Sequence, residues 1–146
     1  MSLNSDLYQK DFYTWCILQE NILDKRNLEE LDIQHLKEEI KALGERHFRE
    51  LKSRLTNLFL HLLKWKYQPN LQSHSWIYSI RVARKKIPEH LKEYPGLQNE
   101  FEKACEKAYS DARWECSLES GLVLEDLPID MPFTIEEALD LKWMPD

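Results

Sequence analysis

The feature that most constrains this chain is a stripe of apolar side chains that recurs every three or four residues between positions 33 and 67. That spacing places side chains on one face of an α-helix. Gln68 stands before Pro69, and a residue before proline avoids the helical conformation. We therefore predict one helix over 33–67, with a stripe of Leu36, Ile40, Leu43, Phe48, Leu51, Leu55, Leu58, Leu62 and Trp65.

Gly44 lies on the stripe side of this helix, four residues from both Ile40 and Phe48. A glycine inside a helix costs about 1 kcal/mol relative to alanine, so its presence calls for a reason. We predict that an aromatic ring of another helix approaches Gly44 closely, and a kink is the alternative.

Cap residues and apolar spacing predict two further helices around the long one. The first covers about 6–24, with Ser5 or Asp6 as its cap. The next begins after Ser73 or Ser75, because either hydroxyl can cap a first turn. Its inward stripe is Trp76, Ile80, Ala83 and Ile87, Pro88 either kinks it or opens a short separate piece, and it ends before Pro95 and Gly96.

Two more helices complete the prediction. One covers about 97–119, with small residues on its inner face and Gly121 as its C-terminal cap. The last is short, near 135–141, and begins with a capping box formed by Thr134 and Glu137.

These elements predict an all-α fold, in which four main helices form an elongated antiparallel bundle with a short C-terminal helix packed on it. A 35-residue helix spans roughly 50 Å, whereas a compact globule of this length is roughly 40 Å across. We expect residues 1–146 to form a single domain, because no repeat or low-complexity segment divides the chain.

The formal net charge of -6 conceals an uneven distribution along the chain. Residues 1–45 hold 5 basic and 10 acidic side chains, residues 46–92 hold 11 and 2, and residues 93–146 hold 4 and 14. The middle segment is therefore strongly basic between two acidic flanks, which is the pattern of either a cationic binding face or internal charge pairing.

A cationic face would lie near one end of the helix hairpin within residues 46–92. Five of its side chains are candidates for binding an anion or a nucleic acid, with aromatic rings nearby for stacking: Lys64, Lys66, Arg81, Arg84 and Lys85. In the alternative, the basic helices lie against the acidic ones and neutralise them. An overall pI near 5.4 favours that alternative.

Three local patterns could supply pairs of metal ligands: Asp32 with His35, His35 with Glu38, and His47 with Glu50. Imaginable third ligands are Glu20, Asp111 or Glu115. Metal sites in helix bundles often use Glu-x-x-His pairs, as in di-iron proteins, and this sequence has no such pair. We therefore expect Asp32 to cap a helix, the histidines to be structural, and no metal or cofactor to be bound.

Catalytic signals are absent from the sequence. There is no GxSxG elbow and no glycine-rich phosphate loop. The three cysteines form no CxxC pair, so we expect Cys16, Cys105 and Cys116 to act as small core side chains. No apolar run is long enough for a membrane span and no secretory signal is evident, so we expect a cytoplasmic protein that does not enter a membrane.

Eight short sequence segments follow one another in a fixed order over about residues 8–140. They are DFYTW, LKEEIKALG, HLLKWKYQP, SW followed by IR, PGL, AYSDAR, ESGL and MPFTIEEAL. Together they resemble domain-of-unknown-function family 29, whose members are small proteins abundant in cyanobacteria. The resemblance implies an all-α fold. It implies no activity, cofactor or partner, and no catalytic residue is carried over from it.

From these observations we expect a non-enzymatic interaction module that binds a protein partner or a copy of itself. Binding of nucleic acid or another anion through the basic hairpin is the second hypothesis. An uncharacterised enzyme or metal protein is the third.

Overall fold

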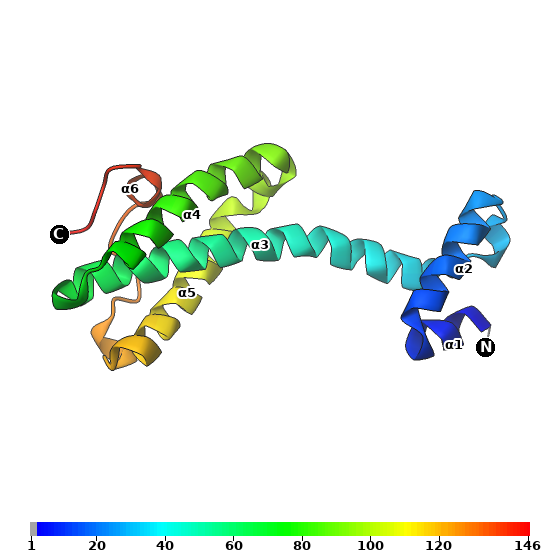
Figure 1. The fold of residues 1–146 in the computed structure, drawn as a ribbon, viewed down its shortest axis with the longest axis horizontal. Coiled ribbons are helices and arrows are strands. Elements are labelled where there is room, and N and C mark those ends of the chain that lie inside the picture. Colours follow the sequence, from blue (N-terminus) through cyan, green and yellow to red (C-terminus); the bar gives the residue numbers. More distant parts are fainter. Residues whose placement is uncertain (1–2) are drawn as a thin grey trace. The chain divides into compact units, whose positions relative to one another are not determined.

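The computed structural model describes the backbone of residues 3–146 and the side chains of residues 6–146. Within that range it contains six α-helices, four short 3-10 turns and no strand, which confirms the all-α class. Figure 1 shows the order of the helices: α1 (Leu3–Lys10), α2 (Phe12–Asp24), α3 (Ile33–Tyr67), α4 (His74–Glu93), α5 (Phe101–Ser120) and α6 (Ile135–Leu139).

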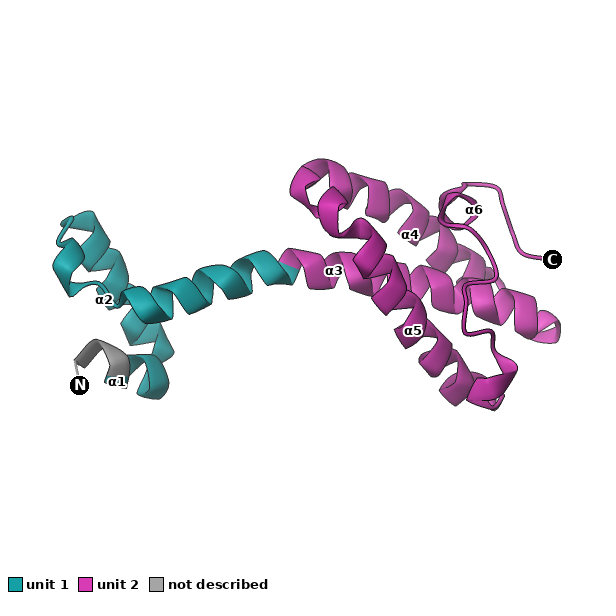
Figure 2. Ribbon diagram, turned by 180° about the vertical axis from the view of Figure 1, so that it is seen from behind, with its two compact units in different colours: residues 1–46 teal, residues 47–146 magenta. Residues whose placement is uncertain are grey.

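The chain divides into two compact units, residues 1–46 and residues 47–146, and the boundary falls inside α3 (Figure 2). Four helices are long, as predicted, but they are shared between the units. Helix α2 belongs to unit 1, whereas α4, α5 and the second half of α3 belong to unit 2. The single-domain prediction is not tested by this division and stays a prediction.

The predicted helix over 6–24 is wrong in one respect, because two helices occupy this stretch. Asp11 separates α1 from α2 and caps α2: its carboxylate accepts hydrogen bonds from the Thr14 amide at 3.1 Å and the Thr14 hydroxyl at 2.6 Å. The bond from the amide gives the first turn of α2 one of the acceptors that its backbone lacks. Asp6 lies inside α1 instead of capping it, and the side chain of Ser5 lies outside the described ones.

Most other helix ends follow the local signals. Helix α3 covers the predicted range, and Pro88 lies inside a continuous α4. Ser73 is the N-cap of α4 by position, but its hydroxyl lies 3.0 Å from that of Ser75 and does not cap the first turn as predicted. Helix α5 begins at Phe101 instead of about residue 97, because Pro95–Glu100 forms a 3-10 helix. Gly121 ends α5 with a φ of 77°, the left-handed conformation that glycine adopts without strain. Thr134 and Glu137 form the complete capping box of α6.

The core of unit 2 is built by α3, α4, α5 and the C-terminal segment, with α4 running back along the second half of α3 (Figure 1). Leu51, Leu55, Leu58 and Leu62 on α3 are fully buried there. From α5 the core receives Cys105 and Cys116, which confirms their prediction as core side chains, while Cys16 is partly exposed.

Side-chain donors hold the irregular segment after α5 on the helices. The Tyr109 hydroxyl donates to the Pro128 carbonyl at 2.7 Å, and the Arg113 guanidinium donates to the carbonyls of Leu127 and Leu124 at 3.0 and 2.8 Å. These carbonyls lie outside the α-helices, and the carbonyl of Leu124 also accepts from the Leu127 amide at 3.1 Å. The segment is therefore a fixed part of unit 2.

Candidate functional site

The first half of α3 exposes two apolar side chains that the sequence predicts to be buried, Ile40 and Leu43. Ile33 is 67% exposed, Ile40 is 66% exposed and Leu43 is 52% exposed, while Leu36 is partly buried. We call Ile33, Leu36, Ile40 and Leu43 the α3 stripe. Their spacing of 3, 4 and 3 residues places them on one face of the helix, which is the arrangement that pairs one helix with another.

Gly44 beside the α3 stripe has no close neighbour. A Cβ atom built at this position meets nothing within 4 Å. The predicted approach of an aromatic ring is therefore wrong, and the glycine adjoins open space.

Unit 1 buries little apolar surface of its own. Among the side chains described in residues 6–46, the buried apolar ones are Trp15 and Ile22. Besides the α3 stripe, this unit also exposes Phe12, Tyr13, Ile17, Leu23 and Leu28. Isolated apolar side chains on a surface are ordinary, but a regular stripe on a helix indicates a contact surface.

A buried polar network holds unit 1 together around Asp32. The Trp15 indole donates to the Asp32 carboxylate at 3.0 Å, the Asp32 amide donates to the Gln19 side-chain oxygen at 2.9 Å, and His35 Nδ1 lies 2.7 Å from the carboxylate. Burial raises the pKa of Asp32, but the hydrogen bonds from His35 and Trp15 outweigh it and hold the pKa below its ordinary value.

His35 therefore has a structural role. Its ring stacks on Tyr8 with centroids 3.9 Å apart, and the Tyr8 hydroxyl donates to Glu39 at 2.6 Å. The hydrogen bond to Glu39 is the main reason that the pKa of Tyr8 rises to about 12. Asp32 caps the start of α3 as predicted, accepting from the His35 amide at 3.4 Å.

Three of the five predicted anion-binding cations, Lys64, Lys66 and Arg84, have partners within the chain. Lys64 forms an ion pair with Glu119 on α5, and its ammonium lies 5.7 Å from the centre of the Trp76 ring. Lys66 donates to the Asp146 carbonyl at 3.4 Å. A second ion pair between α3 and α5 joins Lys52 to Asp111 at 3.3 Å, which is the arrangement that the charge-pairing alternative predicts.

Arg84 is buried, in contrast to its predicted place on a binding face. It donates to the Ala138 carbonyl at 2.8 Å and to the Trp143 carbonyl at 2.7 Å, so it anchors the C-terminal segment. Burial lowers the pKa of its guanidinium. Arg81 and Lys85 are exposed, and anion binding by them stays a prediction.

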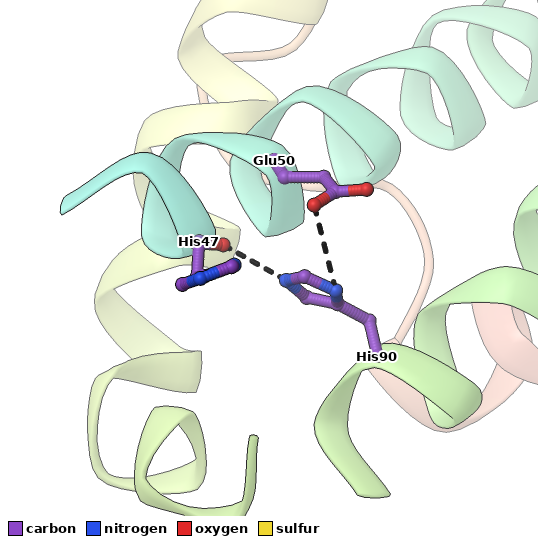
Figure 3. A group of neighbouring side chains, drawn as sticks. All are labelled: His47, Glu50 and His90. Carbon is purple, nitrogen blue, oxygen red and sulfur yellow. Dashed lines mark hydrogen bonds and ion pairs between the residues drawn. The ribbon is translucent and has the colours of Figure 1, made fainter. Parts of the chain in front are cut away.

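One predicted ligand pair gains a third member in the structure. His47 and Glu50 lie one turn apart on α3, and His90 of α4 points between them (Figure 3). Potential ligand atoms of the three side chains all lie within 4.8 Å of one another. None of the third ligands considered from the sequence, Glu20, Asp111 or Glu115, belongs to this group, which we call the His47 cluster.

His90 escaped the sequence analysis because it is 43 residues from His47, so no local motif joins them. A signal was nevertheless present. His90 continues the inward stripe of Ile80, Ala83 and Ile87 at the next three-residue step, which places a histidine on a core face.

His61 on α3 lies outside this cluster and has a structural role. Its Nδ1 donates a hydrogen bond to the Asn57 carbonyl at 2.7 Å, and burial lowers its pKa.

A cleft of about 560 Å³ lies between α5 and the C-terminal segment. Its potentially reactive side chains are Cys105 and Tyr109, and burial is the main cause that raises the pKa of each to about 12. Both groups therefore stay protonated at neutral pH and are poor nucleophiles or bases. The carboxylates around the cleft belong to Glu102, Glu106, Asp130 and Glu136.

These features define the class of protein: an all-helical chain of two compact units with an exposed apolar helix stripe in one and a histidine–glutamate cluster in the other. Among the residues described, none of the helices combines the length and the apolar character needed to cross a bilayer. Comparison with protein families matches residues 7–144 to the Domain of unknown function DUF29. The chain belongs to that family, as its sequence segments indicated. No curated protein and no solved structure matches it.

Proposed function

We propose that this protein is a non-enzymatic interaction module that binds a second copy of itself through the α3 stripe. The observation that carries the proposal is the exposure of Ile33, Ile40 and Leu43 on one face of a long helix. Removing such side chains from water is the dominant gain in association between proteins.

A second copy fits this surface because the stripe is complementary to itself. Dimers with two-fold symmetry use the same patch on both subunits, and an apolar helix face can pack on its own copy. Residues 33–46 hold three basic and three acidic side chains: Lys37, Lys41, Arg46, Glu38, Glu39 and Glu45. This segment is therefore neutral, so two copies meet there without the repulsion that a chain of net charge -6 otherwise produces.

Sedimentation equilibrium over a range of protein concentrations tests this proposal. We expect the wild-type chain to dimerise reversibly, and the double variant Ile40→Glu with Leu43→Glu to be monomeric at the same concentrations, because burying the new carboxylates is costly. The matched control is Leu118→Glu, which alters an exposed apolar side chain on α5 in unit 2.

The control should dimerise as the wild type does. A wild-type chain that stays monomeric at several hundred micromolar would overturn the proposal, and so would a double variant that dimerises as strongly as the wild type. Circular dichroism of each variant verifies that its helices are retained.

The proposal includes a cytoplasmic setting. It is supported by the three cysteines, all of which are free thiols in the structure. Proteins of reducing compartments keep their thiols unpaired, whereas secreted domains use them in disulfides.

A further inference from the structure

In the His47 cluster, the two ring nitrogens of His90 face two different groups of α3. His90 Nε2 lies 2.9 Å from the His47 carbonyl, which can only accept, so this nitrogen carries the proton. In the neutral imidazole the other nitrogen, Nδ1, then holds a lone pair, and it lies 3.8 Å from the Glu50 carboxylate. A cation bound between these two atoms, or a second proton on the imidazole, would make their contact attractive.

The two carboxylate oxygens of Glu50 face different groups. Arg54 donates to Oε1 at 3.0 Å. Arg54 thus occupies one carboxylate oxygen and leaves Oε2 facing His90. The oxygen nearest the imidazole is the one available as a ligand.

His47 supplies an independent observation. Its Nδ1 is buried and has no hydrogen-bond partner among the described residues. A buried polar atom without a partner is rare, and in a native protein it calls for an explanation such as an ion or a water molecule. The ring stacks on Tyr94, with centroids 4.0 Å apart, and one of its nitrogens belongs to the cluster.

We propose that His47, Glu50 and His90 bind a zinc ion, with Nδ1 of each histidine and Oε2 of Glu50 as ligands. Two imidazoles and one carboxylate form a donor set that suits Zn²⁺ and disfavours Mg²⁺ and Ca²⁺, which take oxygen ligands. In a tetrahedral zinc site neighbouring ligand atoms are about 3.3 Å apart. The separation of 3.8 Å between His90 Nδ1 and Glu50 Oε2 must therefore shrink by about 0.5 Å, and the other ligand separations, which lie within 4.8 Å, by at most about 1.5 Å.

The surroundings of the cluster already resemble the outer shell of a metal site. Histidine ligands usually donate their second ring nitrogen to a carbonyl or carboxylate, and carboxylate ligands are themselves hydrogen-bonded. His90 donates to the His47 carbonyl, and Glu50 accepts from Arg54. Three protein ligands leave a fourth position, and Glu50 is exposed, so water or an external donor can reach the ion.

Binding of zinc would join α3 to α4, because His47 and Glu50 come from the first helix and His90 from the second. This inference is independent of the proposed self-association, since all three ligands lie in unit 2 and the α3 stripe lies in unit 1. Failure of one proposal therefore leaves the other untouched.

Calorimetric titration of the chelator-treated full chain with Zn²⁺ tests the site, with Mg²⁺ as the comparison ion. We expect one Zn²⁺ per chain and no Mg²⁺ binding in the same range. Each of the variants Glu50→Gln and His90→Gln should bind Zn²⁺ at least tenfold more weakly. The matched controls are Glu89→Gln and His74→Gln, which alter exposed side chains on α4 and should leave binding unchanged.

Spectroscopy separates a direct ligand role from a folding defect. Co²⁺ in place of Zn²⁺ should give visible absorption bands of four- or five-coordinate geometry in the wild type, and these should be lost in Glu50→Gln while its helical circular dichroism is retained. Nitrogen-detected NMR should find both His47 and His90 protonated at Nε2 in the zinc-bound chain. Absence of stoichiometric Zn²⁺ binding, equal binding by Glu50→Gln and the controls, or coordination through Nε2 would overturn the proposal.

Discussion

At the scale of single residues, the same charge can serve binding or structure according to its neighbours. Arg84 and Lys85 are adjacent in sequence, yet Arg84 is buried against two backbone carbonyls while Lys85 is exposed. The sequence grouped them in one basic cluster. It could not distinguish them because the carbonyls that Arg84 serves come from residues more than fifty positions later.

Replacing Arg84 with Met should lower the free energy of unfolding by about 2–4 kcal/mol, because the carbonyls of Ala138 and Trp143 lose a charged donor. Urea denaturation followed by circular dichroism measures the change. The neighbouring substitution Lys85→Met is the control and should change stability by less than about 0.5 kcal/mol. Equal effects of the two substitutions would show that the bonds from Arg84 contribute nothing.

At the scale of helices, local signals predicted much of the fold. The ends of α3, the N-cap of α4, the glycine after α5 and the capping box of α6 all depend on residues within a few positions of each other. Asp11 was missed as a cap because the apolar spacing continues across it, although Asp with Thr three residues later is itself a capping pattern.

Which part of a stripe is covered could not be predicted, because periodicity identifies a face but not what packs on it. The spacing is the same at Ile40 and Leu43 as at Leu55 and Leu58, yet the first pair is exposed and the second is buried. The complete His47 cluster could not be predicted for the same reason. Its α3 pair is a local pattern, whereas His90 comes from a different helix.

Replacing Gly44 with Ala should raise the free energy of unfolding by about 0.5–1 kcal/mol. Alanine favours the helix, and the new methyl group meets no neighbour within 4 Å. Denaturant unfolding at low protein concentration, where the chain is monomeric, measures this gain. A loss of stability would mean that a neighbour absent from the described contacts lies against Gly44.

At the scale of the whole chain, the two units differ in how much core they possess. Unit 2 has a continuous cluster of buried apolar side chains drawn from three long helices and the C-terminal segment. Unit 1 contributes Trp15 and Ile22 as buried apolar side chains within the part described. Domains of fewer than about 50 residues rarely fold without a metal, a disulfide or a partner.

We therefore expect a fragment of residues 47–146 to unfold cooperatively on heating, and a fragment of residues 1–46 to lack a cooperative transition when dilute. Circular dichroism and differential scanning calorimetry of the two fragments measure this difference. A 47–146 fragment that shows no heat-absorption peak would support the prediction that residues 1–146 form a single domain. Cooperative unfolding of the dilute 1–46 fragment would show that unit 1 folds without a partner that buries its apolar side chains.

Because Arg84 anchors the C-terminal segment, proteolysis of that segment would affect the stability of the whole of unit 2. A protease that cut the chain just after Leu139 would remove the Trp143 carbonyl and leave part of the guanidinium without an acceptor inside apolar surroundings. Loss of residues 140–146 would therefore destabilise the middle of α4, where Arg84 lies. The stability of the main helices thus depends on the C-terminal residues through the Arg84 guanidinium.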